Sequence, residues 1–233
     1  MKQSGQIMSS VAKGVRYSLP IVLGCVPIGA TYGLLAQRAG LSLWPTLGLS
    51  LFVCAGAAQI MAVSMMQSGM EAAFIIGTTF IVNFRHVLMS AAIAPNLSSW
   101  KTWQRLLLGG VLTDETFVIH SLNFARGDWG PIAAISLNLT VYTVWTTASA
   151  VGHNLGAMIT NPEAWGLDFA LPAMFAGLLL PACGNKPAVA AAVVGGAVSV
   201  GLYLLSAGSW AAFLGALAGA TAGLFFYVKE DAN

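Results

Sequence analysis

The sequence predicts an all-α, polytopic helical membrane protein, and three observations lead to that fold class. Hydrophobic residues make up 57% of the 233 positions and charged residues only 8%, whereas a soluble domain carries about 25% charged residues. The charges lie mostly between apolar runs that are long enough to cross a bilayer. Glycine and proline recur inside these runs. Such a chain satisfies its backbone hydrogen bonds within helices, because the hydrocarbon core offers no water.

Eight apolar segments reach or approach the roughly 20 residues that a transmembrane helix needs. The fourth is the weakest, because it contains Asp114, Glu115 and His120, and it is a span, a half-helix or an interfacial helix. We therefore expect seven or eight membrane segments, some of them broken. The segments are 17–37, 43–67, 72–95, 106–124, 131–151, 164–183, 187–206 and 209–228.

Basic residues indicate how the chain is organised. Lys2, Lys13 and Arg16 precede the first segment, and basic residues accumulate on the cytoplasmic side of membrane proteins. The first segment is long enough to span, so we interpret it as a retained helix and not as a cleaved signal peptide. The expected parts are a cytoplasmic N-terminal segment at 1–16, a single transmembrane transporter domain at 17–228 and a C-terminal tail at 229–233.

Helix breakers inside the first two segments predict interruptions. The first segment contains Pro20 and Pro27, and the second contains Gly56. Proline removes a backbone donor and clashes with the preceding turn, and transporters build binding sites from broken helices at the bilayer midplane. Small residues also allow close helix packing. At Pro27 and Gly56, therefore, a local break and simple packing remain alternatives.

A short internal sequence similarity suggests a repeat. Residues 40–45, GLSLWP, resemble residues 166–172, GLDFALP. Each stretch is followed by a span and then by a patch of small residues, at 55–59 and 182–186. A repeat is typical of transporters.

The third segment carries Asn83, Arg85 and His86 in the middle of an apolar run. An ionisable residue at bilayer depth is expensive and therefore indicates a functional site. The guanidinium of Arg85 matches a carboxylate bidentately, and His86 titrates near neutral pH, so we expect these residues to bind substrate. Two alternatives stay open: Arg85 forms a structural pair with Asp114 or Glu115, or the segment ends early and Arg85 lies at an interface.

The motif Thr113-Asp114-Glu115-Thr116 has two interpretations. Adjacent carboxylates in an apolar run bind and release protons in transporters, so Asp114 and Glu115 are our candidates for proton coupling. Alternatively, Thr113 caps a helix whose first turn carries acidic residues.

Gly56 and Gln59 complete the expected substrate site. A helix broken at Gly56 exposes backbone carbonyls for an ammonium group, and the amide of Gln59 contacts a zwitterion; an interhelical hydrogen bond is the alternative role of Gln59. Asn138, Tyr142 and Trp145 share one helical face. They line a path or form a polar and aromatic packing seam. An apolar side chain would be held by Met61, Met65, Met89 and Phe175.

Several classes of function find no support in the sequence. A net charge of +2 without a basic stripe does not suggest nucleic acid. The three cysteines show neither CxxC nor CxxH spacing, so no disulfide framework or zinc site is expected. HExxH, GxSxG and P-loop motifs are absent from the sequence. We expect no catalytic residue, no cofactor and no metal.

Five motifs occur in an order that resembles the AzlC (azaleucine resistance) family, the large subunit of bacterial branched-chain amino acid exporters. The resemblance covers about residues 14–228. The five motifs are GVRYSLP at 14–20, AGAAQ at 55–59, NFRHVLM at 83–89, LTDETF at 112–117 and GLDFALPAMF at 166–175.

The resemblance implies a multi-pass exporter of valine, leucine, isoleucine and sometimes methionine in the bacterial inner membrane. It also implies a separate small hydrophobic subunit of the AzlD type. Residues 183–186 depart from the family pattern, which puts substrate choice in doubt. Without an ATP-binding motif we expect the energy to come from an ion gradient, most simply protons. The alternatives are a membrane channel or an intramembrane enzyme acting on a small apolar substrate.

Overall fold

The computed structural model describes residues 2–156, 183–205 and 210–231, together with the single residues 158, 176 and 179. All regular elements in these ranges are helices, which confirms the fold class. The chain divides into two compact units, Met1–Ala170 and Leu171–Asn233, and each is treated by itself. Three described helical stretches are long and apolar enough to span a bilayer, namely Gly5–Arg38, Ala72–Leu97 and Lys186–Leu204. The count of seven or eight segments stays a prediction.

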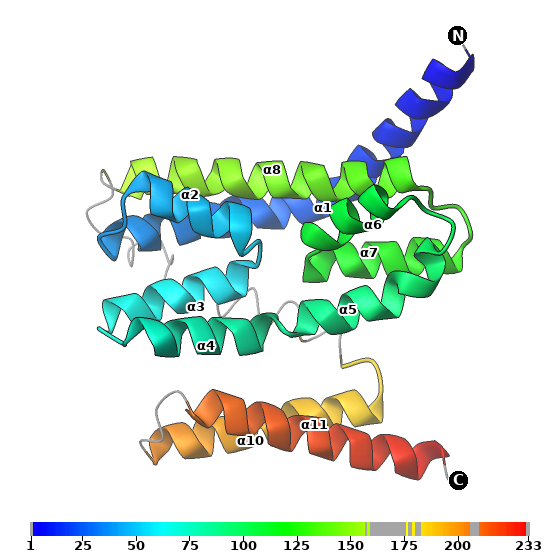
Figure 1. The fold of residues 1–233 in the computed structure, drawn as a ribbon. Helices are drawn as coiled ribbons and strands as arrows, with labels where there is room; N and C mark the ends of the chain where they lie inside the picture. The colour runs from blue at the N-terminus through cyan, green and yellow to red at the C-terminus, as the bar shows by residue number, and fades with distance from the viewer. Residues whose placement is uncertain are drawn as a thin grey trace. The chain divides into compact units, whose positions relative to one another are not determined.

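Two long helices form the frame of the first unit. Helix α1 (Lys2–Arg38) lies alongside α8 (Pro131–Gly156) (Figure 1). Glycines bring the two backbones together: a Cβ at Gly14, Gly33 or Gly152 would collide with a backbone carbonyl of the other helix. Pro20 and Pro27 lie within α1 without ending it, so the break considered at Pro27 does not occur and packing against α8 prevails.

Three of the expected segments are split into shorter helices. The second consists of α2 (Leu43–Phe52) and α3 (Gly56–Gln67). The third consists of α4 (Ala72–Asn83), α5 (Arg85–Ile93) and the 3₁₀ turn η1 (Ala94–Leu97). The fourth lies in α6 (Thr102–Gly110) and α7 (Asp114–Ala125). The three joints are therefore residues 53–55, Phe84 and residues 111–113.

The first and third joints have local causes. Cys54 has φ +48°, the left-handed region that a residue with a side chain rarely adopts. The break at residues 53–55 lies just before Gly56, which begins α3, so the interruption expected near Gly56 is present. At the third joint, Thr113 caps α7 by a reciprocal pair of bonds with Thr116, and Asp114 follows in the first turn. The prediction of a capped helix start is confirmed.

A buried hydrogen-bond network holds α6, α7 and α8 together. The Trp129 indole donates to His120 Nδ1 over 2.9 Å, and His120 Nε2 lies 2.8 Å from Asn138 Oδ1. Because an indole N–H only donates, Nδ1 accepts and Nε2 carries the ring proton. Asn138 Nδ2 then donates to the Leu108 carbonyl over 3.1 Å. The last turn of α6 is thereby fixed to α8.

The second unit contains the hairpin of α10 (Lys186–Leu204) and α11 (Trp210–Asp231). The Asn185 side chain caps α10 by accepting from the Ala188 N–H over 2.8 Å. Glycines again make the contact, since a Cβ at Gly195 would lie 3.0 Å from the Gly215 carbonyl. Residues 166–172, the second copy of the suggested repeat, lie outside the described residues.

Candidate functional site

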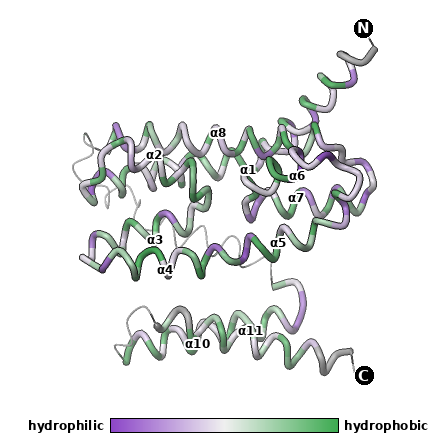
Figure 2. The backbone as a smooth tube through the Cα atoms, in the orientation of Figure 1, coloured by the Kyte–Doolittle hydropathy of each residue, from purple (hydrophilic) through white to green (hydrophobic). Residues whose placement is uncertain are grey.

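A pocket of about 520 Å³ lies where the three helix joints of the first unit meet. Val53 and Cys54 reach it from the first joint, Asn83 and His86 flank the second, and Leu112 belongs to the third. Figure 2 shows apolar residues along most of α4, followed by hydrophilic residues at the junction with α5. Ligand pockets commonly have volumes of about 300–1,000 Å³, so this one has room for a small molecule.

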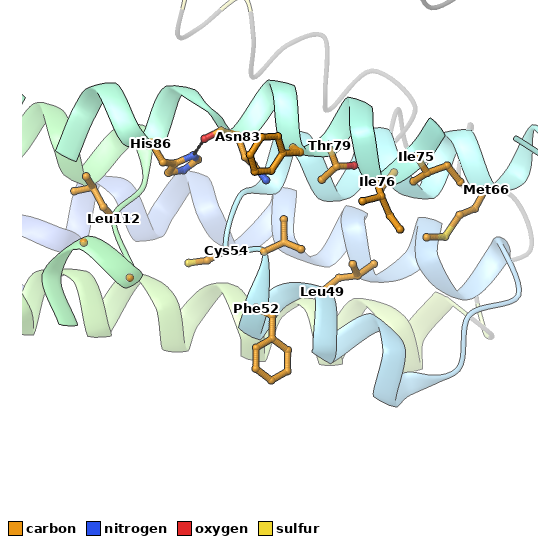
Figure 3. A pocket seen from close by; sticks show the side chains of 15 residues that line it. Leu49, Phe52, Cys54, Met66, Ile75, Ile76, Thr79, Asn83, His86 and Leu112 are labelled. Carbon is orange, nitrogen blue, oxygen red and sulfur yellow. Dashed lines mark hydrogen bonds between the residues drawn. The ribbon is translucent and has the colours of Figure 1, made fainter. Parts of the chain in front are cut away.

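The walls of the pocket are mostly apolar. Four side chains carry polar atoms or a thiol: Cys54, Thr79, Asn83 and His86. In Figure 3, Thr79, Asn83 and His86 lie along one wall, and Cys54 and Leu49 come from the segment opposite. The apolar lining comprises Leu49, Phe52, Val53, Ala62, Met66, Ile75, Ile76, Phe80 and Leu112.

Two of the polar atoms in the pocket wall have no hydrogen-bond partner among the described residues. They are Thr79 Oγ1 and Asn83 Oδ1, and both are buried. His86 Nδ1 lies 3.0 Å from the backbone carbonyl of Asn83. The protein itself therefore leaves these two buried polar atoms of the wall residues without a hydrogen bond.

Arg85 forms an ion pair with Asp114 just beside the pocket. Arg85 Nη2 lies 2.8 Å from Asp114 Oδ2, and the two side chains are 34% and 31% exposed. Arg85 is the first residue of α5 and Asp114 the first of α7, so the pair links two half-helices. Arg85 Nε is buried without a partner among the described residues. The structural pair with Asp114, given as an alternative to substrate binding, is present, and Arg85 is only partly buried and does not line the pocket.

Glu115 has a different environment from Asp114. Its side chain is partly buried at the start of α7, and its charge acts on the thiols of Cys25 and Cys54. Within the described residues the ion pairs are Lys13–Asp128 and Arg85–Asp114. Glu115 thus carries a carboxylate close to the first joint without a described cationic partner.

Gly56 and Gln59 pack against α8 and do not line the pocket. A Cβ at Gly56 would lie 2.9 Å from Trp145 Cζ2 and nearer still to Cη2. Trp145 Nε1 donates to Gln59 Oε1 and Gln59 Nε2 donates to Ser50 Oγ, each over 3.0 Å. Ser50 in turn donates to Ser149 over 3.1 Å. The interhelical role of Gln59, one of the two alternatives, is the one present.

Of the two alternatives for the polar face of α8, the packing seam is the one present. Asn138, Tyr142 and Trp145 all form hydrogen bonds to other helices, and Tyr142 donates to the Leu51 carbonyl over 3.0 Å. The methionines proposed as the apolar wall are placed elsewhere: Met65 packs with Ala62 and Ile75. Phe175 lies outside the described residues.

Sequence reasoning missed Thr79. Thr79 precedes Asn83 by four residues, and this spacing places both side chains on one face of a helix. That spacing was the feature of the sequence that could have identified Thr79. Sequence reasoning also missed Ser50 and Ser149, whose hydroxyls become partners of one another only through the tertiary fold.

Comparison with known proteins places this chain among membrane proteins. A family model described as AzlC protein matches residues 20–159. An uncharacterized membrane protein of Archaeoglobus fulgidus is 33% identical, covering 89% of this chain and 91% of the relative. Inner membrane protein YgaZ of Escherichia coli strain K12 is 29% identical, covering 82% of this chain and 81% of the relative. The branched-chain amino acid transport protein AzlC of Bacillus subtilis strain 168 is 23% identical, covering 90% and 82%.

No solved structure matches the chain. The family model nevertheless spans more than half of it, and the archaeal relative exceeds 30% identity over most of both sequences. The resemblance drawn from the five motifs is therefore confirmed, and this chain belongs to the AzlC family of membrane proteins.

Proposed function

We propose that this chain is a secondary transporter that exports branched-chain or other hydrophobic amino acids across the bacterial inner membrane. The observation that carries the proposal is the pocket at the junction of three interrupted helices. Transporters bind substrate where discontinuous helices present backbone ends and polar side chains in an otherwise apolar site. The family and the printed function of the Bacillus relative support the class of substrate.

The shape and chemistry of the pocket suit a small hydrophobic amino acid. Its lining is apolar apart from the residues grouped at Thr79, Asn83 and His86. A branched side chain would gain about 25 cal/mol for each Å² of apolar surface that it buries there. Gly56 and Gln59 act in this proposal by holding α3 against Trp145, and so keep the pocket wall in place.

We propose that proton movement drives export through Asp114, with Glu115 as the second acidic group. Protonation of Asp114 removes the charge that attracts Arg85. Arg85 would then lie as an unpaired cation at the start of α5, where the helix dipole disfavours positive charge by about 0.3–1 kcal/mol. Loss of this ion pair weakens the contact between α5 and α7, and the two half-helices are then free to change position.

We further propose that the transporter works with a small membrane subunit of the AzlD type in the lipid bilayer. Helices α10 and α11 are rich in glycine and alanine, and Val193 and Val200 are exposed on α10. Exposed apolar and small residues on a membrane helix allow close approach of another helix.

Counterflow of labelled leucine tests the proposal. Purified protein is reconstituted in liposomes with and without the small subunit, and uptake against unlabelled internal leucine is followed over time. Saturable counterflow is expected. Unsaturable flux without counterflow would favour a channel, and covalent conversion of leucine would favour an intramembrane enzyme; either result would overturn the transporter proposal.

A further inference from the structure

Three hydrogen-bond acceptors follow one another along one wall of the pocket. Thr79 Oγ1 and Asn83 Oδ1 lie about one helical turn apart on α4 and have no partner among the described residues. His86 Nδ1 lies 3.0 Å from the Asn83 carbonyl. Since a carbonyl only accepts, Nδ1 carries a proton, and Nε2 is an acceptor whenever the ring is neutral. Figure 3 shows the three side chains on the same wall.

Thr79 differs in its hydrogen bonding from several other helical threonines. Thr31, Thr140 and Thr146 donate to the carbonyl four residues earlier, over 2.9, 2.7 and 2.9 Å. This is the usual way in which threonine satisfies its hydroxyl inside an apolar helix. Thr79 Oγ1 is buried and makes no such bond. A buried polar atom without a partner costs free energy and calls for an explanation.

Three helix C-termini at the pocket favour a cation, whereas the N-terminal end of α5, where His86 lies, does not. The lining contains no Asp, Glu, Lys or Arg, and Arg85 is engaged with Asp114 outside the lining. The C-terminal ends of α2, α4 and α6, at Phe52, Asn83 and Gly110, all contribute to the lining. The C-terminal end of a helix carries the negative pole of its dipole and favours positive charge.

We propose that Thr79, Asn83 and His86 bind the ammonium group of an amphiphilic primary amine, with Thr79 as a specificity-determining residue. The three N–H donors of the ammonium match three acceptors on the wall. This inference rests on the proposed function and deepens it: the amino group of the transported amino acid lies at α4, and its side chain lies against the apolar lining. The carboxylate meets no cation in the pocket.

Equilibrium binding to the full-length protein in detergent tests the inference with two labelled ligands. Leucine carries both charged groups, whereas 3-methylbutylamine carries the ammonium alone. Thr79→Val keeps the shape of the side chain and removes the acceptor, so both ligands should bind roughly tenfold more weakly or worse. Thr79→Ser should restore binding. Thr78→Val, the same change at the adjacent position outside the lining, is the matched control and should leave both affinities unchanged.

The outcomes separate this inference from the proposed function. Competition by 4-methylpentanoate, which has the carboxylate alone, should be weak in every variant. Leucine binding that is equal in wild type and Thr79→Val overturns the inference while the transporter proposal stands. Thr79-dependent binding of 3-methylbutylamine without binding of leucine supports the ammonium site and overturns the proposed substrate. Binding of neither ligand overturns both.

Discussion

Asn138 accepts from His120 Nε2 over 2.8 Å and donates to the Leu108 carbonyl over 3.1 Å, so one amide on α8 fixes both α7 and the end of α6. Replacement by leucine, Asn138→Leu, keeps the volume and leaves two buried polar groups without partners. The free energy of unfolding should fall by about 1–3 kcal/mol, which thermal unfolding in detergent will measure. Thr140→Val is the control, since that hydroxyl bonds only within α8. An unchanged unfolding temperature in Asn138→Leu would contradict the structural role.

Gly56 should tolerate no larger residue, because its Cα faces the Trp145 ring. Gly56→Ala places a methyl group within 2.9 Å of Trp145 Cζ2, so the indole must move away from Gln59. We expect a lower unfolding temperature and a lower rate of leucine counterflow. Gly48→Ala is the matched control on α2, where nothing lies within 4 Å of the added Cβ, and it should stabilise the helix by about 0.5–1 kcal/mol. Equal stability of the two alanine variants would contradict the Gly56–Trp145 contact.

Arg85 should not be replaceable by lysine. Its Nη2 contacts Asp114, whereas its Nε, another nitrogen of the same planar guanidinium, is buried. An ammonium is a point charge that does not reproduce this fork. We expect Arg85→Lys to lower the initial rate of export on the order of tenfold, the factor that about 1.4 kcal/mol represents. Normal export by a variant inserted in the membrane at the wild-type level would rule out a role for the guanidinium.

Asp114 and Glu115 should contribute unequally to coupling. Asp114→Asn keeps the size of the side chain and removes the charge that Arg85 contacts, so uphill export driven by a pH gradient should be lost while counterflow persists. Glu115→Gln, tested separately, should change coupling less, because Glu115 forms no ion pair among the described residues. If both variants retain proton-driven uphill export, the coupling group lies elsewhere, with His86 the next candidate.

Export should require the small membrane subunit. Co-expression of a tagged AzlD-type protein should yield a complex that survives purification, and leucine export in liposomes should appear only when both chains are present. Valine-to-lysine substitutions at Val193 and Val200, which are exposed on α10, should weaken co-purification if that face is the contact. Full export by this chain alone would remove the need for a partner.

The sequence predicted the helical class, the joint near Gly56, the cap at Thr113 and the pairing of Arg85 with a carboxylate. Each of these follows from local chemistry. A glycine among small residues favours an interruption of a helix, threonine before acidic residues favours a helix start, and a cation in apolar surroundings needs an anionic partner. Such constraints act within a few residues or on a scarce residue type, and can therefore be inferred before the fold is known.

The role of Gln59 and the importance of Thr79 did not follow from the sequence. Gln59 bonds to Ser50 and Trp145, which are 9 and 86 positions away, and no spacing rule selects such partners. Thr79 lies in an apolar run, and the hydroxyl of a threonine in such a helix normally bonds to a backbone carbonyl of the same helix. Only the packed arrangement distinguishes a hydroxyl that has a hydrogen-bond partner from one that is buried without one.

The glycine contacts between α1 and α8 restrict how the first unit can change shape. Where a Cα meets a carbonyl directly, there are no side chains whose rotamers can adjust. Sliding one helix along the other would drive the Cβ atoms of neighbouring residues into the opposite backbone. We therefore expect the α1–α8 pair to stay rigid, and in the proposed transporter a change of access would come from movement of the half-helices at residues 53–55, at Phe84 and at residues 111–113.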